Sequence, residues 1–119
     1  MAADENVLDD GMTEEQELSF QIIASSGYAR SLAFEALRKA KDGAFDEAHD
    51  LLEQAKTASI DGHNAQTSMI TKEASGERVD VGIIVVHAQD HLMTSMLAQE
   101  LIEEIVELRE EIARSKSGN

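Results

Sequence analysis

The sequence contains no cysteine, no proline and no tryptophan among its 119 residues. Without cysteine there can be no disulfide, no thiolate metal site and no cysteine nucleophile. Without proline the chain lacks the residue that most often ends or kinks a helix, and alternating runs of β-branched residues are also scarce. Alanine, glutamate and leucine dominate instead, and these residues favour helices. We therefore expect an all-α fold.

Aromatic side chains are almost as scarce, with three phenylalanines and one tyrosine. A chain of this length is expected to form a single domain with a modest core. That core must be aliphatic, and we expect it to be rich in methionine. So thin a core is often completed by burial between subunits.

Basic residues are few, since ten lysines and arginines accompany 24 acids and the formal net charge is −14. This balance argues against nucleic-acid binding, which needs cationic side chains to replace the counterions of phosphates, and against direct membrane binding. The longest apolar run, residues 81–86, is too short to span a bilayer. The acidic first residues lack the pattern of a signal peptide, so a cytoplasmic location is expected.

The chain is expected to divide into a tail and one helical domain. Residues 1–12 are acidic with little that is apolar, which predicts a disordered tail. Residues 13–119 are expected to form a three-helix domain, because apolar residues recur at helical spacing in three segments. The connections between the segments are short, which makes neighbouring helices antiparallel.

Local signals place the first two helices. Thr13 and Gln16 have the spacing of a capping box, which predicts a helix start, and Gly43 predicts its end. The second helix is expected from about residue 45 to a turn at residues 74–80.

Two positions within these helices carry further expectations. Gly27 costs a helix about 1 kcal/mol relative to alanine, so we expect close packing there. Ile60 falls on the predicted buried side of the second helix.

The third helix, expected from about residue 81 to 113, carries two apolar lines. One is a coiled-coil-like seam at three- and four-residue steps, formed by Val86, Asp90, Met93, Leu97, Leu101, Ile105, Leu108 and Ile112. The other runs through Ile84, Leu92, Met96 and Ile102. So wide an apolar arc predicts contacts beyond two neighbouring helices, and we infer a homo-oligomer packed through this helix.

Asp90 is the charged member of the seam. A carboxylate there must be exposed, protonated, hydrogen-bonded or bound to a cation. In a symmetric oligomer, copies of Asp90 would meet at the axis, where a divalent ion such as Mg²⁺ would offset their repulsion. Alternatively, Asp90 lies in water at the edge of the seam, or it only fixes the oligomeric state.

His87 and His91 lie one helical turn apart and share a face with Asp90. A neutral histidine nitrogen accepts a phosphoryl group well when a partner holds the other nitrogen. Gln89 could orient a phosphoryl oxygen, and Asp90 or Thr94 could hold a ring. The plainer interpretation makes both histidines partly buried structural residues.

A rival interpretation involves zinc. The stretch HAQDH has the H-x-x-[DE]-H form that places two imidazoles on one face for this metal. A third protein ligand is needed, and His63 could approach His91 if the second helix folds back over the third. His63 is otherwise a packed or surface residue. No phosphate-loop or dinucleotide motif is present, so any phosphoryl donor must be another protein.

The segment VHAQDHLMTSMLAQELIEEIVEL resembles the phosphorylation-site helix of one family: enzyme IIA of the lactose/cellobiose (N,N'-diacetylchitobiose) class of the bacterial phosphoenolpyruvate-dependent sugar phosphotransferase system. ARSLAFEAL, GAFDEA and HNAQTSMITKEASGE resemble the same family, so the likeness covers about residues 14–108. It implies a homotrimer of three-helix hairpins, with the third helices around the threefold axis.

The resemblance also implies residue roles. His87 matches the histidine that accepts a phosphoryl group from the phosphocarrier HPr and passes it to the cysteine of enzyme IIB, which acts with the membrane enzyme IIC. Asp90 matches the acid whose three copies meet at the axis and can bind a divalent cation. Gln89 and His91 match motif residues near the site, and His63 matches a residue of unassigned role. The transported sugar would be a β-linked disaccharide, cellobiose or chitobiose rather than lactose.

Two other functions stay open. A two-component histidine phosphotransfer module is also a helical bundle with a phosphohistidine, but such modules typically carry lysine where this chain has Asp90. A metal-stabilised trimeric scaffold without catalysis is the other.

Overall fold

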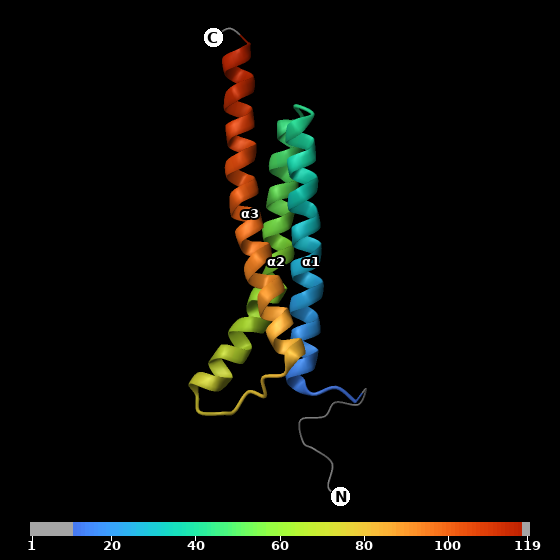
Figure 1. Ribbon diagram of the computed structural model, residues 1–119, viewed down its shortest axis with the longest axis vertical. Coiled ribbons are helices and arrows are strands. Elements are labelled where there is room, and N and C mark those ends of the chain that lie inside the picture. The colour runs from blue at the N-terminus through green and yellow to red at the C-terminus, as the bar shows by residue number, and fades with distance from the viewer. Residues whose placement is uncertain (1–10, 118–119) are drawn as a thin grey trace, which may run out of the picture.

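The computed structural model describes residues 11–117, so most of the tail predicted at residues 1–12 lies outside the described part. The described chain forms three helices and no strand: α1 (Glu14–Lys41), α2 (Phe45–Ala74) and α3 (Ile83–Lys116). They run antiparallel side by side, and α3 projects beyond the α1–α2 turn (Figure 1). The predicted all-α class and the order of three helices are confirmed.

The ends of α1 are set by local chemistry. The Gln16 backbone N–H donates to Thr13 Oγ1, and the Thr13 N–H donates to Gln16 Oε1, both at 3.1 Å. This predicted capping box satisfies two backbone donors that the first turn leaves free. At the other end, Gly43 has φ of +80°. Glycine adopts this left-handed conformation without the clash that a Cβ would cause, so the chain reverses there.

The core is aliphatic, as predicted, but it is built from alanine rather than methionine. Of the methionines in the described part, only Met69 is buried, whereas Met93 is 55% exposed. Small side chains allow the helices to approach one another closely, and the cores are completed by a few larger residues such as Ile22, Leu92 and Val106. The buried alanines are Ala29, Ala33, Ala36, Ala40, Ala48, Ala55, Ala65 and Ala88.

Two packing predictions are wrong. A Cβ placed on Gly27 would meet open space, whereas one on Gly62 would lie 3.0 Å from Ser25 Oγ. Close approach therefore occurs at Gly62. Ile60 is 53% exposed rather than buried. It follows the partly buried Ala58 by two residues, which places it about 200° further around the helix, on the solvent side.

The two apolar lines of α3 have different fates. Leu92 and Ile102 are buried inside the chain, and Ile84 and Met96 are half-buried. The seam instead faces solvent, because its apolar members are between 40% and 55% exposed: Val86, Met93, Leu97, Leu101, Ile105, Leu108 and Ile112. A single chain thus leaves a long apolar stripe along α3, of the kind that marks a contact surface.

None of the helices in residues 11–117 is long and apolar enough to cross a membrane.

Candidate functional site

The first turns of α3 bring His87 and His91 into contact. Their ring centroids lie 4.5 Å apart with the planes at 79°, an edge-to-face arrangement. His87 is exposed and His91 is half-buried. None of the described residues forms a hydrogen bond to either ring, so the nitrogens of His87 are accessible to a reacting group. His87 is thus more exposed than the plainer interpretation expects, whereas the half-buried His91 agrees with it.

Thr94 does not hold a histidine ring. Its hydroxyl donates to the backbone carbonyl of Asp90 at 2.7 Å, and more weakly to that of His91 at 3.4 Å. Threonine in a helix commonly bonds to carbonyls of the preceding turn. The prediction that Thr94 fixes a ring is therefore wrong.

Asp90 lies beside His87, and both line an open hollow of about 470 Å³ with Ile83, Ile84 and Val86. Asp90 is exposed, and its carboxylate forms no hydrogen bond or ion pair with another described residue. Residues 11–117 contain no group of three histidine or acidic side chains that could hold a metal ion. The described residues of one chain therefore do not by themselves form a metal site around Asp90.

His63 is not brought to His91. It is exposed on α2, where its backbone carbonyl accepts a hydrogen bond from the Thr67 hydroxyl at 3.0 Å. α2 packs against the face of α3 that carries Gln89, whereas His91 lines a hollow with α1. The described part of the chain thus does not form the zinc site that HAQDH left open.

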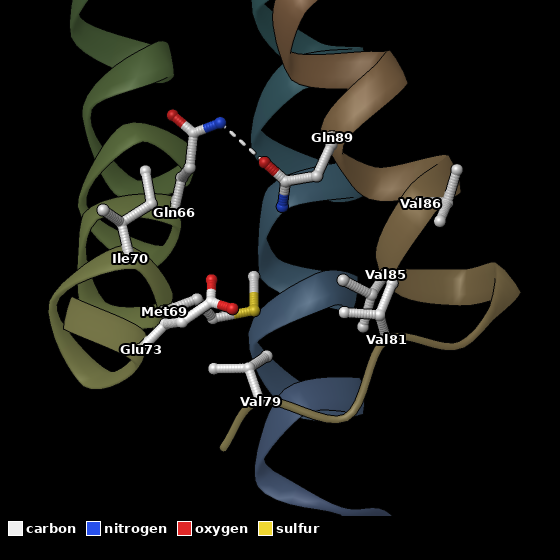
Figure 2. A pocket seen from close by; sticks show the side chains of 9 residues that line it. All are labelled: Gln66, Met69, Ile70, Glu73, Val79, Val81, Val85, Val86 and Gln89. Atoms are coloured by element: carbon white, nitrogen blue, oxygen red, sulfur yellow. Dashed lines mark hydrogen bonds between the residues drawn. The ribbon is translucent and has the colours of Figure 1, made fainter. Parts of the chain in front are cut away.

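Gln89 faces away from His87. Two residues along a helix are about 200° apart around its axis. The Gln89 side chain accordingly points toward α2, where its Oε1 accepts a hydrogen bond from Gln66 Nε2 at 2.6 Å (Figure 2). The structure brings together His87, Asp90 and His91, but it does not bring Gln89 to His87 within one chain.

Gln66 and Gln89 border a hollow of about 190 Å³ between the C-terminal part of α2 and the start of α3. The connection between the two helices closes one end of the hollow (Figure 2). Most of the lining side chains are apolar: Met69, Ile70, Val79, Val81, Val85 and Val86 accompany Glu73 and the two glutamines.

Sequence reasoning missed a cationic groove beside His91. Four exposed or small residues of α1 at helical spacing line it: Gly27, Arg30, Ser31 and Phe34, followed by Arg38. The Arg30 guanidinium lies 5.6 Å from the centroid of the Phe34 ring. Neither arginine forms an ion pair with a described residue, so both can meet an anion. The four-residue steps from Arg30 to Arg38 in the sequence were a usable signal.

An ion pair fixes the end of α2 near the hollow. Lys72 Nζ lies 2.8 Å from Glu15 Oε1 and 3.6 Å from Glu14 Oε2. The hydrogen bond to Glu15 raises the pKa of Lys72 above its ordinary value of 10.5. Because Glu15 is only 3% exposed, this contact ties the C-terminal part of α2 to the start of α1.

Comparison with known families identifies the family to which this chain belongs. Residues 17–110 match the family model described as PTS system, Lactose/Cellobiose specific IIA subunit. The chain belongs to this enzyme IIA family. The matched range includes His87, Gln89, Asp90 and His91. The protein is therefore a IIA component of a sugar phosphotransferase system of the lactose/cellobiose type, and the resemblance of HAQDH and its surroundings is confirmed.

Individual relatives agree with this assignment. The IIA chain is 45% identical over 106 residues to the N,N'-diacetylchitobiose-specific EIIA component of Escherichia coli K12, covering 87% of this chain and 91% of the relative. It matches the crystal structure of the cellobiose-specific enzyme IIA of Bacillus anthracis with a TM-score of 0.84 at 38% identity, over 90% of this chain and 98% of the other. It also matches IIA(chitobiose) in the solution structure of its complex with HPr from E. coli, with a TM-score of 0.73 at 43% identity, over 86% and 99% of the two chains.

Proposed function

We propose that this IIA chain is a phosphocarrier that accepts a phosphoryl group on His87 from HPr and passes it to the cysteine of enzyme IIB. The exposed His87 ring, with no described side chain hydrogen-bonded to its nitrogens, is the observation that carries the proposal. Family membership supports it, as does the E. coli relative whose structure was solved with HPr. Family membership also favours the phosphocarrier role over that of a two-component phosphotransfer module.

Phosphoryl transfer requires little covalent chemistry from the chain itself. A nitrogen of His87 forms a bond to phosphorus while the nitrogen–phosphorus bond of phospho-HPr breaks. In the next step the cysteine thiolate of enzyme IIB forms the sulfur–phosphorus bond, and the His87 nitrogen leaves. Both steps depend on in-line positioning and on stabilising the charge of the phosphoryl oxygens. The groove of Arg30 and Arg38 beside His91 would supply positive charge for this purpose.

We further propose that the chain works as a homotrimer packed through the seam of α3. The support is the apolar stripe that a single chain leaves between 40% and 55% exposed. Closed rotational symmetry would bury this stripe along one axis.

A threefold assembly would also place Gln89. His87 and Gln89 lie on opposite sides of the seam, as their separation of about 200° around α3 requires. In a ring of three copies, the side that carries His87 in one copy faces the side that carries Gln89 in the next. Gln89 would thus assist the histidine of a neighbouring copy rather than His87 of its own chain.

Asp90 would then contribute one carboxylate per copy to the axis. Carboxylate oxygens suit Mg²⁺, and Asp90 has no other partner among the described residues, so the residue fits a divalent cation site. A bound cation would offset the mutual repulsion of the three carboxylates. We propose this site as a structural one and give the cation no part in phosphoryl transfer.

The sugar is proposed as a β-linked disaccharide, cellobiose or chitobiose rather than lactose. The E. coli relative is named for N,N'-diacetylchitobiose and the B. anthracis structure for cellobiose. The sugar itself would be bound by the membrane enzyme IIC. A cytoplasmic location is proposed, because HPr and enzyme IIB must reach His87.

Transfer onward from His87 tests the proposal. The phosphorylated chain would be purified, mixed with enzyme IIB, and followed by phosphorus NMR, with an enzyme IIB whose cysteine is replaced by serine as control. We expect the phosphohistidine signal to fall as a phosphocysteine signal rises, and no change with the control. A phosphoryl group that stays on His87 would contradict the carrier role. A His87→Ala chain that keeps its assembly and still supports sugar uptake would favour the trimeric scaffold.

A further inference from the structure

We propose that Gln66 is a positioning residue for phosphoryl transfer. It fixes the Gln89 side chain so that the amide N–H₂ of Gln89 stays free as a hydrogen-bond donor for the phosphoryl oxygens on His87 of a neighbouring copy. The inference rests on the proposed function, and it assigns a role to a residue of α2 that lies outside the HAQDH motif.

The contact between the two amides sets the orientation. A glutamine side chain has one oxygen acceptor and two N–H donors. The Gln89 oxygen is occupied, since it accepts the hydrogen bond of 2.6 Å from Gln66 Nε2. The Gln89 nitrogen points away from Gln66 into the hollow between α2 and α3 (Figure 2). None of the described residues accepts a hydrogen bond from this nitrogen, so both donors stay available.

The orientation decides whether Gln89 helps or hinders transfer. Phosphoryl oxygens carry negative charge and only accept hydrogen bonds, so an N–H₂ group facing them is stabilising and a carbonyl oxygen is repulsive. The terminal torsion of a glutamine side chain is broad and roughly two-fold, so an unheld amide would populate both orientations. Holding the oxygen on Gln66 removes the unfavourable one before the phosphoryl group arrives.

A side chain of α1 sets the position of Gln66. The Ser25 hydroxyl donates to the Ala58 carbonyl at 2.5 Å and accepts from the Gly62 N–H at 3.0 Å. Ala58 and Gly62 form one i to i+4 backbone pair of α2, so the Ser25 hydroxyl bridges a rung of the helical ladder. Insertion of a side chain into this ladder is an established cause of helix bending.

The C-terminal part of α2 is bent. The yellow-green C-terminal part of α2 turns away from α3 in Figure 1. The hollow beside Gln89 lies next to this part of α2, and Gln66 follows Gly62 by about one turn. The ion pair of Lys72 with Glu15 holds the far end of the bent segment. Gln66 is thus held between two fixed points, and from there its side chain reaches Gln89.

Two substitutions of Gln66 test the role. Gln66→Met keeps the length without polar atoms, and Gln66→Glu keeps the shape but cannot donate at neutral pH. Gln54→Glu is the matched control, since Gln54 is an exposed residue of α2 that bonds only to Asp50. The rate of transfer from phospho-HPr would be measured over a range of phospho-HPr concentrations.

We expect both Gln66 variants to lower kcat by about tenfold with little change in KM, which is less than the ~10²–10³-fold loss that removal of a stabilising donor itself causes. Gln54→Glu should match the wild type. If Gln66 acts through Gln89, the double variant Gln66→Met/Gln89→Ala should be no slower than Gln89→Ala alone.

A second measurement does not depend on transfer. The side-chain amide signals of Gln89 in a ¹⁵N-labelled protein should move toward those of an exposed glutamine in Gln66→Met, and stay in place in Gln54→Glu.

The outcomes separate this inference from the proposed function. Wild-type kcat in Gln66→Glu, or unmoved Gln89 signals in Gln66→Met, would overturn the positioning role while leaving the carrier role intact. Failure of the wild-type chain to accept a phosphoryl group would overturn the proposed function, and this inference with it.

Discussion

Replacement of Leu97 by aspartate should break the assembly without unfolding the chain. Leu97 lies in the middle of the seam and is 55% exposed in a single chain. Full burial of a leucine is worth roughly 1.5–3 kcal/mol, so covering the exposed half of Leu97 would contribute about 0.8–1.6 kcal/mol per copy. Three copies would contribute about 2.5–5 kcal/mol to a trimer. The loss would weaken assembly on the order of 10²- to 10⁴-fold, and three carboxylates close to the axis would weaken it further.

Sedimentation velocity at micromolar concentration measures the result. The wild type should sediment at about three times the chain mass of 13.0 kDa, and Leu97→Asp at the mass of one chain. Ile60→Asp is the matched control, because Ile60 is 53% exposed but lies on α2, away from the seam. It should remain a trimer. Circular dichroism should show unchanged helicity in both variants, since neither residue belongs to the buried core.

Two results would refute this reasoning. A wild type with the mass of a single chain would show that the stripe does not drive assembly. Equal dissociation of Leu97→Asp and Ile60→Asp would show that added charge, rather than loss of the seam, causes the effect.

Three further predictions concern stability and metal binding. Gly27→Ala should raise the free energy of unfolding by about 0.5–1 kcal/mol, because a helix interior prefers alanine and the added Cβ has open space. Gly62→Ala should lower the free energy of unfolding, since Ser25 is held by two hydrogen bonds and cannot move away from the added Cβ. Urea unfolding at equal chain concentration compares the two variants. Asp90→Asn should remove any divalent cation that elemental analysis finds in the dialysed wild type. Asp61→Asn, at an exposed position of α2, should retain the cation. A cation that stays bound in Asp90→Asn would contradict the axial site. Because the pKa of Lys72 is raised, the contribution of its ion pair to stability is complete below pH 10.5 and is lost as the pH rises through the higher folded-state pKa. The stability difference between the wild type and Lys72→Met should therefore shrink in strongly alkaline buffer. A constant difference would contradict the ion pair.

The parts of the fold that depend on neighbouring residues could be predicted from the sequence. The capping box of Thr13 and Gln16 and the stop at Gly43 are local devices, and both occur as expected. The contact of His87 with His91 likewise follows from four-residue spacing on a helix. α3 begins at Ile83, two residues later than expected, and helix ends are commonly uncertain by this amount.

The parts that depend on which helix faces meet could not be predicted. Gly27 and Gly62 carry the same intrinsic helix penalty, and only the arrival of Ser25 beside Gly62 distinguishes them. The pairing of Gln66 with Gln89 joins residues 23 positions apart on different helices, and no periodicity reports it. The core contains alanine where we expected methionine, because α1 and α2 approach closely. This close approach is again a property of the packed helices.

The central claim is that His87 carries the phosphoryl group. Intact mass spectrometry of the chain after incubation with phosphoenolpyruvate, enzyme I and HPr tests it most directly, with His87→Ala and His91→Ala measured beside the wild type. The account predicts a gain of one acid-labile phosphoryl group in the wild type and in His91→Ala, and none in His87→Ala. No gain by the wild type with active upstream proteins, or an undiminished gain in His87→Ala, would contradict it.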